Sequence, residues 1–260
     1  MSLNRISFSA VKKNLYWIAI LIFLFLLWQW LVSILIIPEY ILPTPSKIAL
    51  KIIQKQQYLI RHSLITLSEI LAGFALGVSA AFILSLGMVY SKTMEKVVYP
   101  LLMLIQVTPK VAIAPLFLIW FGFGLLPKII IAALVGFFPS IINTVKGLKS
   151  IDSELADLMH SLSANKRQFL IKVRIPSALP YVFAGLKVSM ALSVIGAVIG
   201  EFVGASRGLG YVIIIANSNL ETALVFASLF ILSIIGIGSF GIICLIESLY
   251  SWHKPLEFSI

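Results

Sequence analysis

Three long stretches without a charged residue constrain this chain more than any other feature. They cover residues 14–38, 70–91 and 222–246, and each reaches or exceeds the roughly 20 apolar residues that a membrane-spanning helix needs. Only 12% of the 260 residues are charged, about half the share found in a soluble domain, so the chain cannot cover a water-facing surface. We therefore expect an all-α polytopic membrane protein.

The hydrophobic pattern predicts about six transmembrane helices. They are expected at residues 15–37, 66–90, 97–120, 128–146, 180–204 and 222–248, the third interrupted by Pro109 and Lys110. With the N-terminus inside, the inner segments hold twelve lysines and arginines and the outer segments six. Because basic residues concentrate in cytoplasmic loops, both termini are predicted to be cytoplasmic.

The chain is interpreted as one transmembrane domain, 1–260, since no internal repeat or low-complexity linker divides it. Its expected parts are an N-terminal span at 1–37, an outer interfacial segment at 38–65 and a core at 66–250. The longest polar interruption, 147–176, lies inside this core and is expected on the cytoplasmic side. In the outer segment a short interfacial helix is predicted to begin after Pro45.

Composition disfavours several other functions. The net charge of +10 follows from the cytoplasmic bias of lysine and arginine, so no nucleic-acid partner is expected. One cysteine and three scattered histidines give no disulfide, no metal site and no clustered set for a membrane-embedded enzyme. A self-sufficient ion-coupled transporter is the main alternative; it is expected to show an internal repeat or a carboxylate within a span, and the acidic residues are predicted to lie near span ends or in loops.

The polar interruption predicts two short helices. Asp152 or Ser153 is suited to cap the first helix, after which Leu155, Leu158, Met159 and Leu162 share one face. A break is expected at 163–165, and Asn165 with Gln168 resembles a capping box that starts the second helix. Pro176 and Pro180 are expected to end it. The pair either enters a groove of a partner protein or packs on the ends of the spans, and the residues alone favour neither.

Sequence motifs add a family resemblance. Asp157-Leu158-Met159, Ser163 where a glycine is expected, and the ending Ile-Pro-Ser-Ala-Leu-Pro at 175–180 resemble the cytoplasmic loop of permeases in binding-protein-dependent ABC importers. Blocks at 101–124, 137–139, 184–187 and 200–210 follow in the order of one subgroup. That subgroup resembles the nitrate, sulfonate and taurine permeases and includes importers of pyrimidine-like vitamin precursors.

The resemblance implies a type I importer permease fold and a set of partners. Two copies of the permease would pair in a bacterial cytoplasmic (inner) membrane, each docking a cytoplasmic ATP-binding subunit, and an extracytoplasmic solute-binding protein would deliver a small hydrophilic solute. The chain has no G-x-x-x-x-G-K-[ST] sequence, so no cofactor and no enzymatic activity are expected in it, and ATP and Mg would be bound by the partner. The expected docking residues are Glu154, Leu155, Asp157, Leu158, Met159, Leu162, Ser163 and Ala164.

Three residues are candidates for the translocation pathway: Thr108, Lys110 and Glu201. Lys110 lies well inside the bilayer if its helix is continuous, and an ionisable group there is a functional hypothesis by default. Alternatively, Pro109 ends the helix and Lys110 caps exposed carbonyls. Glu201 either holds an outer gate or pairs with Arg207. Lys110 favours anions such as sulfonate, taurine or nitrate, whereas Thr108-Pro109-Lys110 and Phe137-Phe138-Pro139 resemble the pyrimidine-precursor branch.

Overall fold

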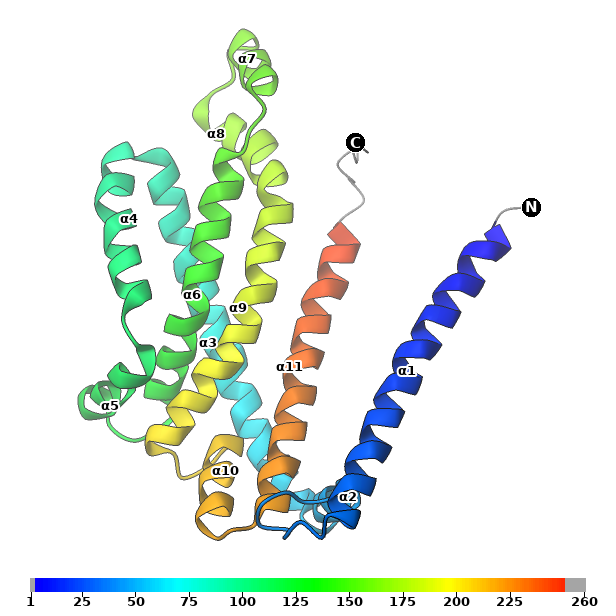
Figure 1. Cartoon of the computed structure of the whole chain (residues 1–260). Coiled ribbons are helices and arrows are strands. Elements are labelled where there is room, and N and C mark those ends of the chain that lie inside the picture. Colours follow the sequence, from blue (N-terminus) through cyan, green and yellow to red (C-terminus); the bar gives the residue numbers. More distant parts are fainter. Residues whose placement is uncertain (1–2, 251–260) are drawn as a thin grey trace. The chain divides into compact units, whose positions relative to one another are not determined.

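A computed structural model describes residues 3–250, and every regular element within that range is helical. The long apolar helices are α1 (Leu3–Ile34), α3 (Gln56–Tyr90), α6 (Leu125–Lys149), α9 (Ile175–Gly204) and α11 (Thr222–Tyr250). Shorter elements connect them: α2 (Pro45–Gln54), α4 (Lys92–Val107), α5 (Lys110–Phe121), α7 (Ser153–Ser161), α8 (Lys166–Phe169), the π-helical turn η1 (Leu170–Arg174) and α10 (Leu209–Ser218). Figure 1 shows the course of the chain.

The described residues fall into two compact units, one within 1–60 and 212–230 and the other within 61–211 and 231–260. In the first unit, Trp28 of α1 makes ring contacts with Phe226 and Phe230 of α11. A helix is present where the interfacial helix is predicted: α2 begins at Pro45 itself rather than after it, and its position at a membrane interface remains a prediction. Lys51 of α2 forms an ion pair of 3.1 Å with Glu221.

Small residues allow the helices of the second unit to pack closely. A Cβ placed on Gly77 of α3 would lie 2.7 Å from the carbonyl oxygen of Ala133 in α6, and one placed on Gly196 of α9 would lie 2.7 Å from the Cα of Ala132. Side chains at these positions would force the backbones apart. Helices α3 and α9 therefore contact α6 from two sides (Figure 1), and Lys187 of α9 forms an ion pair with Glu247 of α11.

The third predicted span is not one helix. Helix α4 ends at Val107 and α5 begins at Lys110, and their axes differ by 99°. Pro109 precedes the first residue of α5 with ψ 104°, an extended conformation that cannot continue a helix. Since proline also lacks the amide hydrogen that a helix interior requires, the chain turns sharply here.

The count of six spans remains a prediction. Among the described residues, α3, α6, the run Lys166–Gly204 and α11 are long and apolar enough to cross a membrane, and the bent pair α4–α5 adds a fifth if it counts as one span. Within α1, the apolar stretch Ala19–Ile34 is shorter than these spans. Helix α10 has 10 residues.

Candidate functional site

The predicted docking loop folds as two short helices separated by a sharp turn. The carboxylate of Asp152 accepts a hydrogen bond of 3.1 Å from the amide of Glu154 and caps α7. Asn165 and Gln168 form the predicted capping box at α8, with reciprocal bonds of 2.8 and 2.9 Å. Between them Ser163 has φ 54°, in the left-handed region where glycine carries no steric cost. This conformation is a physical reason for the glycine that the resemblance leads one to expect there.

The predicted apolar face of α7 is open to the surroundings. Leu158 is 54% exposed and Leu162 67% exposed, and α7 has no buried residue. Leu155 is likewise exposed, whereas Met159 is half-buried. The leucines therefore do not pack on the ends of the spans, which was the alternative interpretation of these helices. Glu154, Asp157 and Ser163 are exposed beside them, and Ala164 is half-buried.

The second loop helix does not end at Pro176 and Pro180. Helix α8 continues through the π turn η1 into α9, and together they form one helical run of 39 residues, Lys166–Gly204. The amide of Ile175 donates to the carbonyl of Leu170 five residues earlier. The π turn changes the hydrogen-bond pattern directly before Pro176, which has no amide hydrogen to donate, and the helix continues into α9. The prediction failed because it treated both prolines as helix terminators.

Thr108 and Lys110 lie at the bend between α4 and α5. Thr108 donates its hydroxyl hydrogen to the carbonyl of Leu104 at 3.0 Å, and the Lys110 ammonium donates to the carbonyl of Gln106. The ammonium also lies 5.1 Å from the ring centre of Phe138 in α6, within the range of a cation–π contact. The second interpretation of Lys110, capping the last carbonyls of a helix that ends at Pro109, agrees with this geometry. Lining of a pathway by either residue remains a prediction.

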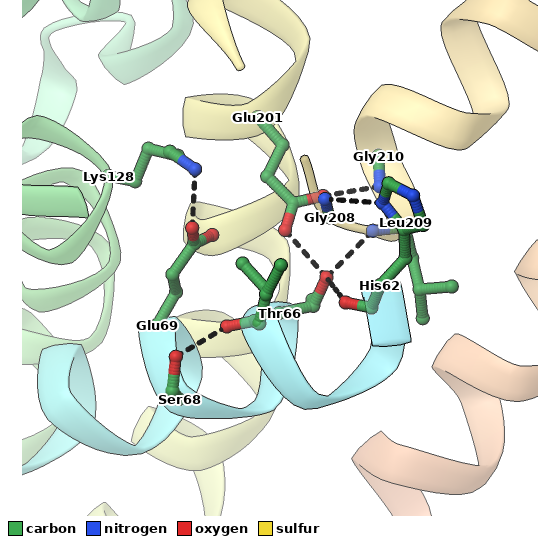
Figure 2. Close-up of polar contacts among 10 residues, drawn as sticks. His62, Thr66, Ser68, Glu69, Lys128, Glu201, Gly208, Leu209 and Gly210 are labelled. Atoms are coloured by element: carbon green, nitrogen blue, oxygen red, sulfur yellow. Dashed lines mark hydrogen bonds and ion pairs between the residues drawn. The ribbon is translucent and has the colours of Figure 1, made fainter. Parts of the chain in front are cut away.

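A buried polar cluster, which we define as His62, Thr66, Glu69, Lys128 and Glu201, joins α3, α6 and α9. The Lys128 ammonium lies 2.5 Å from Glu69 Oε1, and the two side chains are 6% and 0% exposed. Thr66 Oγ1 lies 2.6 Å from Glu201 Oε1. Figure 2 shows the two carboxyl groups on neighbouring faces of α3 and α9.

The cluster also binds the start of α10. Three successive amides donate to it: Gly208 to His62 Nδ1 at 2.9 Å, Leu209 to Thr66 Oγ1 at 2.8 Å, and Gly210 to Glu201 Oε2 (Figure 2). The first amides of a helix have no partner within the helix, and here side chains of α3 and α9 supply the acceptors. Glu201 thus fixes the turn between α9 and α10, which is the structural role considered for it, although its partners are Thr66 and Gly210 rather than Arg207.

Sequence reasoning missed most of this cluster. Lys128 is the first residue of the expected span 128–146 and one of the six basic residues assigned to the outer side, yet it lies in the first turns of α6 and is 4% exposed. Glu69 was placed at the start of a span at 66, yet α3 begins at Gln56, so this buried carboxylate lies within the helix. The sequence shows one acidic and one basic residue, Glu69 and Lys128, each beside an apolar run. It does not show that they pair, because no local spacing connects residues so far apart in sequence.

A cleft of about 390 Å³ adjoins the cluster. Its lining is formed by Phe123, Gly124, Lys128, Gly204, Ala205 and Ser206. The cleft therefore runs between the start of α6 and the turn that follows α9, and Lys128 is the residue shared by the cleft and the cluster.

Comparison with known proteins gives a consistent result. The model of the family described as "binding-protein-dependent transport system inner membrane component" matches residues 73–253. A formylaminopyrimidine transport permease protein, ThiX of Halalkalibacterium halodurans, is 38% identical over 95% of this chain and 98% of its own length. The riboflavin transport system permease protein RibX of Chloroflexus aurantiacus is 38% identical over 95% of this chain and 92% of its own.

Two further similarities are lower. A putative aliphatic sulfonates transport permease protein, SsuC of Bacillus subtilis, is 32% identical over 89% of this chain and 85% of its own. Among solved structures, an amino acid ABC transporter crystallised with histidines has a TM-score of 0.59 at 21% identity, covering 79% of this chain and 98% of that chain. At that identity the structural match supports the fold alone.

Proposed function

The chain belongs to the family of binding-protein-dependent transport system inner membrane components, and we propose how it works within such an importer. It is an ABC importer permease, a membrane protein with several apolar helices. We propose that it carries a small hydrophilic solute into the cytoplasm and binds a separate ATP-binding subunit and an extracytoplasmic solute-binding protein. ATP and Mg belong to the ATP-binding subunit, so the chain itself has no enzymatic activity.

The open apolar face of α7 is the observation that carries the ATPase partnership. Leu155, Leu158 and Leu162 are exposed at a pair of short, well-capped helices. An amphipathic helix with an unpacked apolar face is suited to lie in a hydrophobic groove of a partner. Because this loop leads without a break into α9, movement of a bound ATPase subunit would be passed directly to a membrane-spanning helix. A permease homodimer would carry two such loops, one for each ATPase subunit.

Co-purification of the chain with its ATP-binding subunit in detergent tests this proposal. Leu158→Asp places a charge on the apolar face, whereas the control His160→Asp places one on the other side of the same helix. We expect the parent and His160→Asp to retain the ATPase and Leu158→Asp to lose it, with all three equally folded. Retention by Leu158→Asp, or loss by both variants, contradicts docking through this face.

For the transported solute we propose a pyrimidine-precursor-like molecule, with a sulfonate or taurine as the second candidate. Permeases named for formylaminopyrimidine and riboflavin share 38% of residues with this chain, against 32% for the sulfonate relative and 28% for a taurine permease of Escherichia coli. Uptake of labelled solutes by the reconstituted importer decides between them. Uptake of a sulfonate without uptake of a pyrimidine precursor rejects the first candidate.

For the pathway, we propose that Thr108 and Lys110 contribute to it, because they lie at the bend between α4 and α5 where helical regularity is broken. Irregular backbone at membrane depth is tolerated where it is buried in protein or lines a cavity. A groove beside this bend is lined by Pro100, Met103, Leu104, Val107, Thr108 and Pro109. For Glu201 the buried bonds to Thr66 and Gly210 favour holding the outer turn over contact with solute.

We propose a bacterial inner-membrane location from the family description, with both termini in the cytoplasm because the count of lysines and arginines favours that orientation. This orientation places α7 and α8 inside and the turn between α9 and α10 outside. The ATPase and the solute-binding protein would then contact opposite ends of the same permease.

A further inference from the structure

The buried polar cluster contains two carboxyl groups and one ammonium group. Glu69, Lys128 and Glu201 are 0%, 4% and 1% exposed. If all three were ionised, the cluster would hold one uncompensated negative charge. Such a charge is costly to bury in a protein and more so within a membrane span, so the cluster needs one more positive charge or one more proton.

No further buried cation faces these carboxyl groups among the described residues. His62, the remaining titratable member of the cluster, accepts the Gly208 amide hydrogen at Nδ1. That nitrogen therefore carries no hydrogen, and the imidazole is neutral, because both nitrogens of a charged imidazole are donors. Arg61 and Arg207, the charged residues nearest to His62, are exposed to solvent.

The hydrogen bonds also lack one hydrogen. Glu69 Oε1 accepts from Lys128, but Glu69 Oε2 is buried and receives a hydrogen from no described donor. The Glu201 carboxyl group lies on the facing side of α9 (Figure 2). Ionised carboxylates only accept hydrogen bonds, so neither of the two can supply the missing hydrogen unless it carries a proton.

Thr66 indicates the same deficit. Its hydroxyl lies 3.2 Å from the carbonyl of His62 and 2.6 Å from Glu201 Oε1, while it accepts the amide of Leu209 at 2.8 Å. A hydroxyl has one hydrogen and cannot donate to both oxygens. A proton on Glu201 Oε1 removes the conflict, because Glu201 then donates to the Thr66 hydroxyl and leaves its hydrogen for the carbonyl of His62.

We propose that Glu69 and Glu201 share one proton, so that the buried polar cluster is a proton-binding site which keeps the turn between α9 and α10 attached to α3. With the proton the cluster is neutral, since the remaining carboxylate balances Lys128. Without it, two carboxylates repel each other, and the acceptors for the Leu209 and Gly210 amides are displaced. The cleft that Lys128 lines gives water a route to the site. This inference does not depend on the transported solute or on the ATPase partner.

Infrared spectroscopy of the purified full-length chain tests the shared proton. A protonated carboxylic acid has a carbonyl stretching band that an ionised carboxylate lacks. Glu69→Gln and Glu201→Gln each leave one carboxylate beside Lys128, a neutral cluster with no proton to share. We expect the wild-type band at neutral pH to vanish in both variants and to survive in the control Glu221→Gln, whose side chain is 41% exposed in a surface ion pair.

Two double variants sharpen the test. Lys128→Met with Glu69→Gln removes one charge of each sign and leaves Glu201 as a protonated acid, so the band is expected to remain. Glu69→Gln with Glu201→Gln leaves Lys128 uncompensated and is expected to melt at a lower temperature than either single variant. The folded wild type holds the proton, so its melting temperature is expected to fall as the pH is raised. The single variants hold no such proton, so their melting temperatures are expected not to fall in this way.

Absence of the band from folded wild-type protein overturns the proposal, as does a band that persists in both single variants. Should either glutamine variant fail to fold, Glu201→Asp replaces it. This variant retains an acid in a changed position, so a band from the cluster shifts in frequency, and an unshifted band assigns the proton to another residue.

Discussion

Gly208 and Ser163 both have positive φ angles, 113° and 54°, and they illustrate two ways in which single residues set the turns of this permease. At Gly208 the backbone leaves the region that L-residues favour, and a Cβ would overlap the Glu201 carboxyl group. At Ser163 the angle lies in the left-handed helical region, which a small polar residue adopts at a modest cost. A side chain at position 208 is therefore not tolerated. At position 163 glycine would fit best, and the serine found there differs from it only by its small side chain.

Gly208→Ala is expected to destabilise the protein. Backbone strain of this kind costs about 1–3 kcal/mol, and the new methyl group would also push Glu201 away from Thr66 and the Gly210 amide. Gly238→Ala is the matched control, because a Cβ there meets nothing within 4 Å and alanine favours a helix over glycine by about 0.5–1 kcal/mol. Thermal unfolding in detergent should give a lower melting temperature for the first variant and an equal or higher one for the second. Equal melting of both would contradict the strained turn.

For single residues, the sequence predicted the interactions that form between residues close together in the chain. Asp152 as a cap and Asn165 with Gln168 as a capping box were confirmed, because a cap is defined within a few positions. The pairing of Lys128 with Glu69 was missed because it joins residues separated by 59 positions. Loss of Lys128 would leave a buried carboxylate without its cation, and an uncompensated buried charge of this kind costs about 3–5 kcal/mol.

Among the elements, the pair α4–α5 differs most from a simple span. Its bend of 99° exposes carbonyls at the end of α4, and the Lys110 ammonium donates to one of them, that of Gln106. The same ammonium lies over the Phe138 ring of α6. The lysine thus caps the end of α4 at the bend, and contact of its charge with an anionic or electron-rich solute remains a prediction.

Lys110→Met separates these two roles. If the charge contacts the solute, uptake per folded importer falls by about tenfold, which corresponds to about 1.4 kcal/mol, while Lys110→Arg retains most of it. If the lysine only caps α4, the melting temperature falls and uptake per folded molecule stays the same. Uptake by proteoliposomes and thermal unfolding of the same preparations measure both quantities. Unchanged uptake by folded Lys110→Met would remove Lys110 from the pathway.

Element prediction succeeded where a long apolar run dominates and failed at prolines. The expected spans at 128–146 and 222–248 correspond to α6 and α11. Pro109 breaks a helix as suspected, yet Pro176 and Pro180 lie within a helix that continues. The difference lies in the position of the hydrogen bonds around each proline, since the π turn at Leu170–Arg174 precedes Pro176. Sequence spacing does not show that arrangement.

For the whole molecule, the orientation in the membrane can be measured by cysteine accessibility. In a Cys244→Ser background, Ser161→Cys lies on α7 and Ser206→Cys in the turn after α9, and both positions are exposed. With both termini in the cytoplasm, a membrane-impermeant maleimide should label position 206 in intact cells and position 161 only in inverted vesicles. The opposite labelling pattern would reverse the proposed orientation, and labelling of both from one side would contradict the predicted spans.

The uninterrupted run Lys166–Gly204 has a mechanical consequence for the permease. At 1.5 Å per residue, its 39 residues form a lever arm about 58 Å long. The proposed ATPase contact adjoins one end and Glu201 lies near the other, so no joint between separate helices would absorb a tilt. A tilt of about 10° about one end would move the far end by about 10 Å at this length. A small rotation imposed by the ATPase would therefore reach the turn at Gly208 as a large displacement.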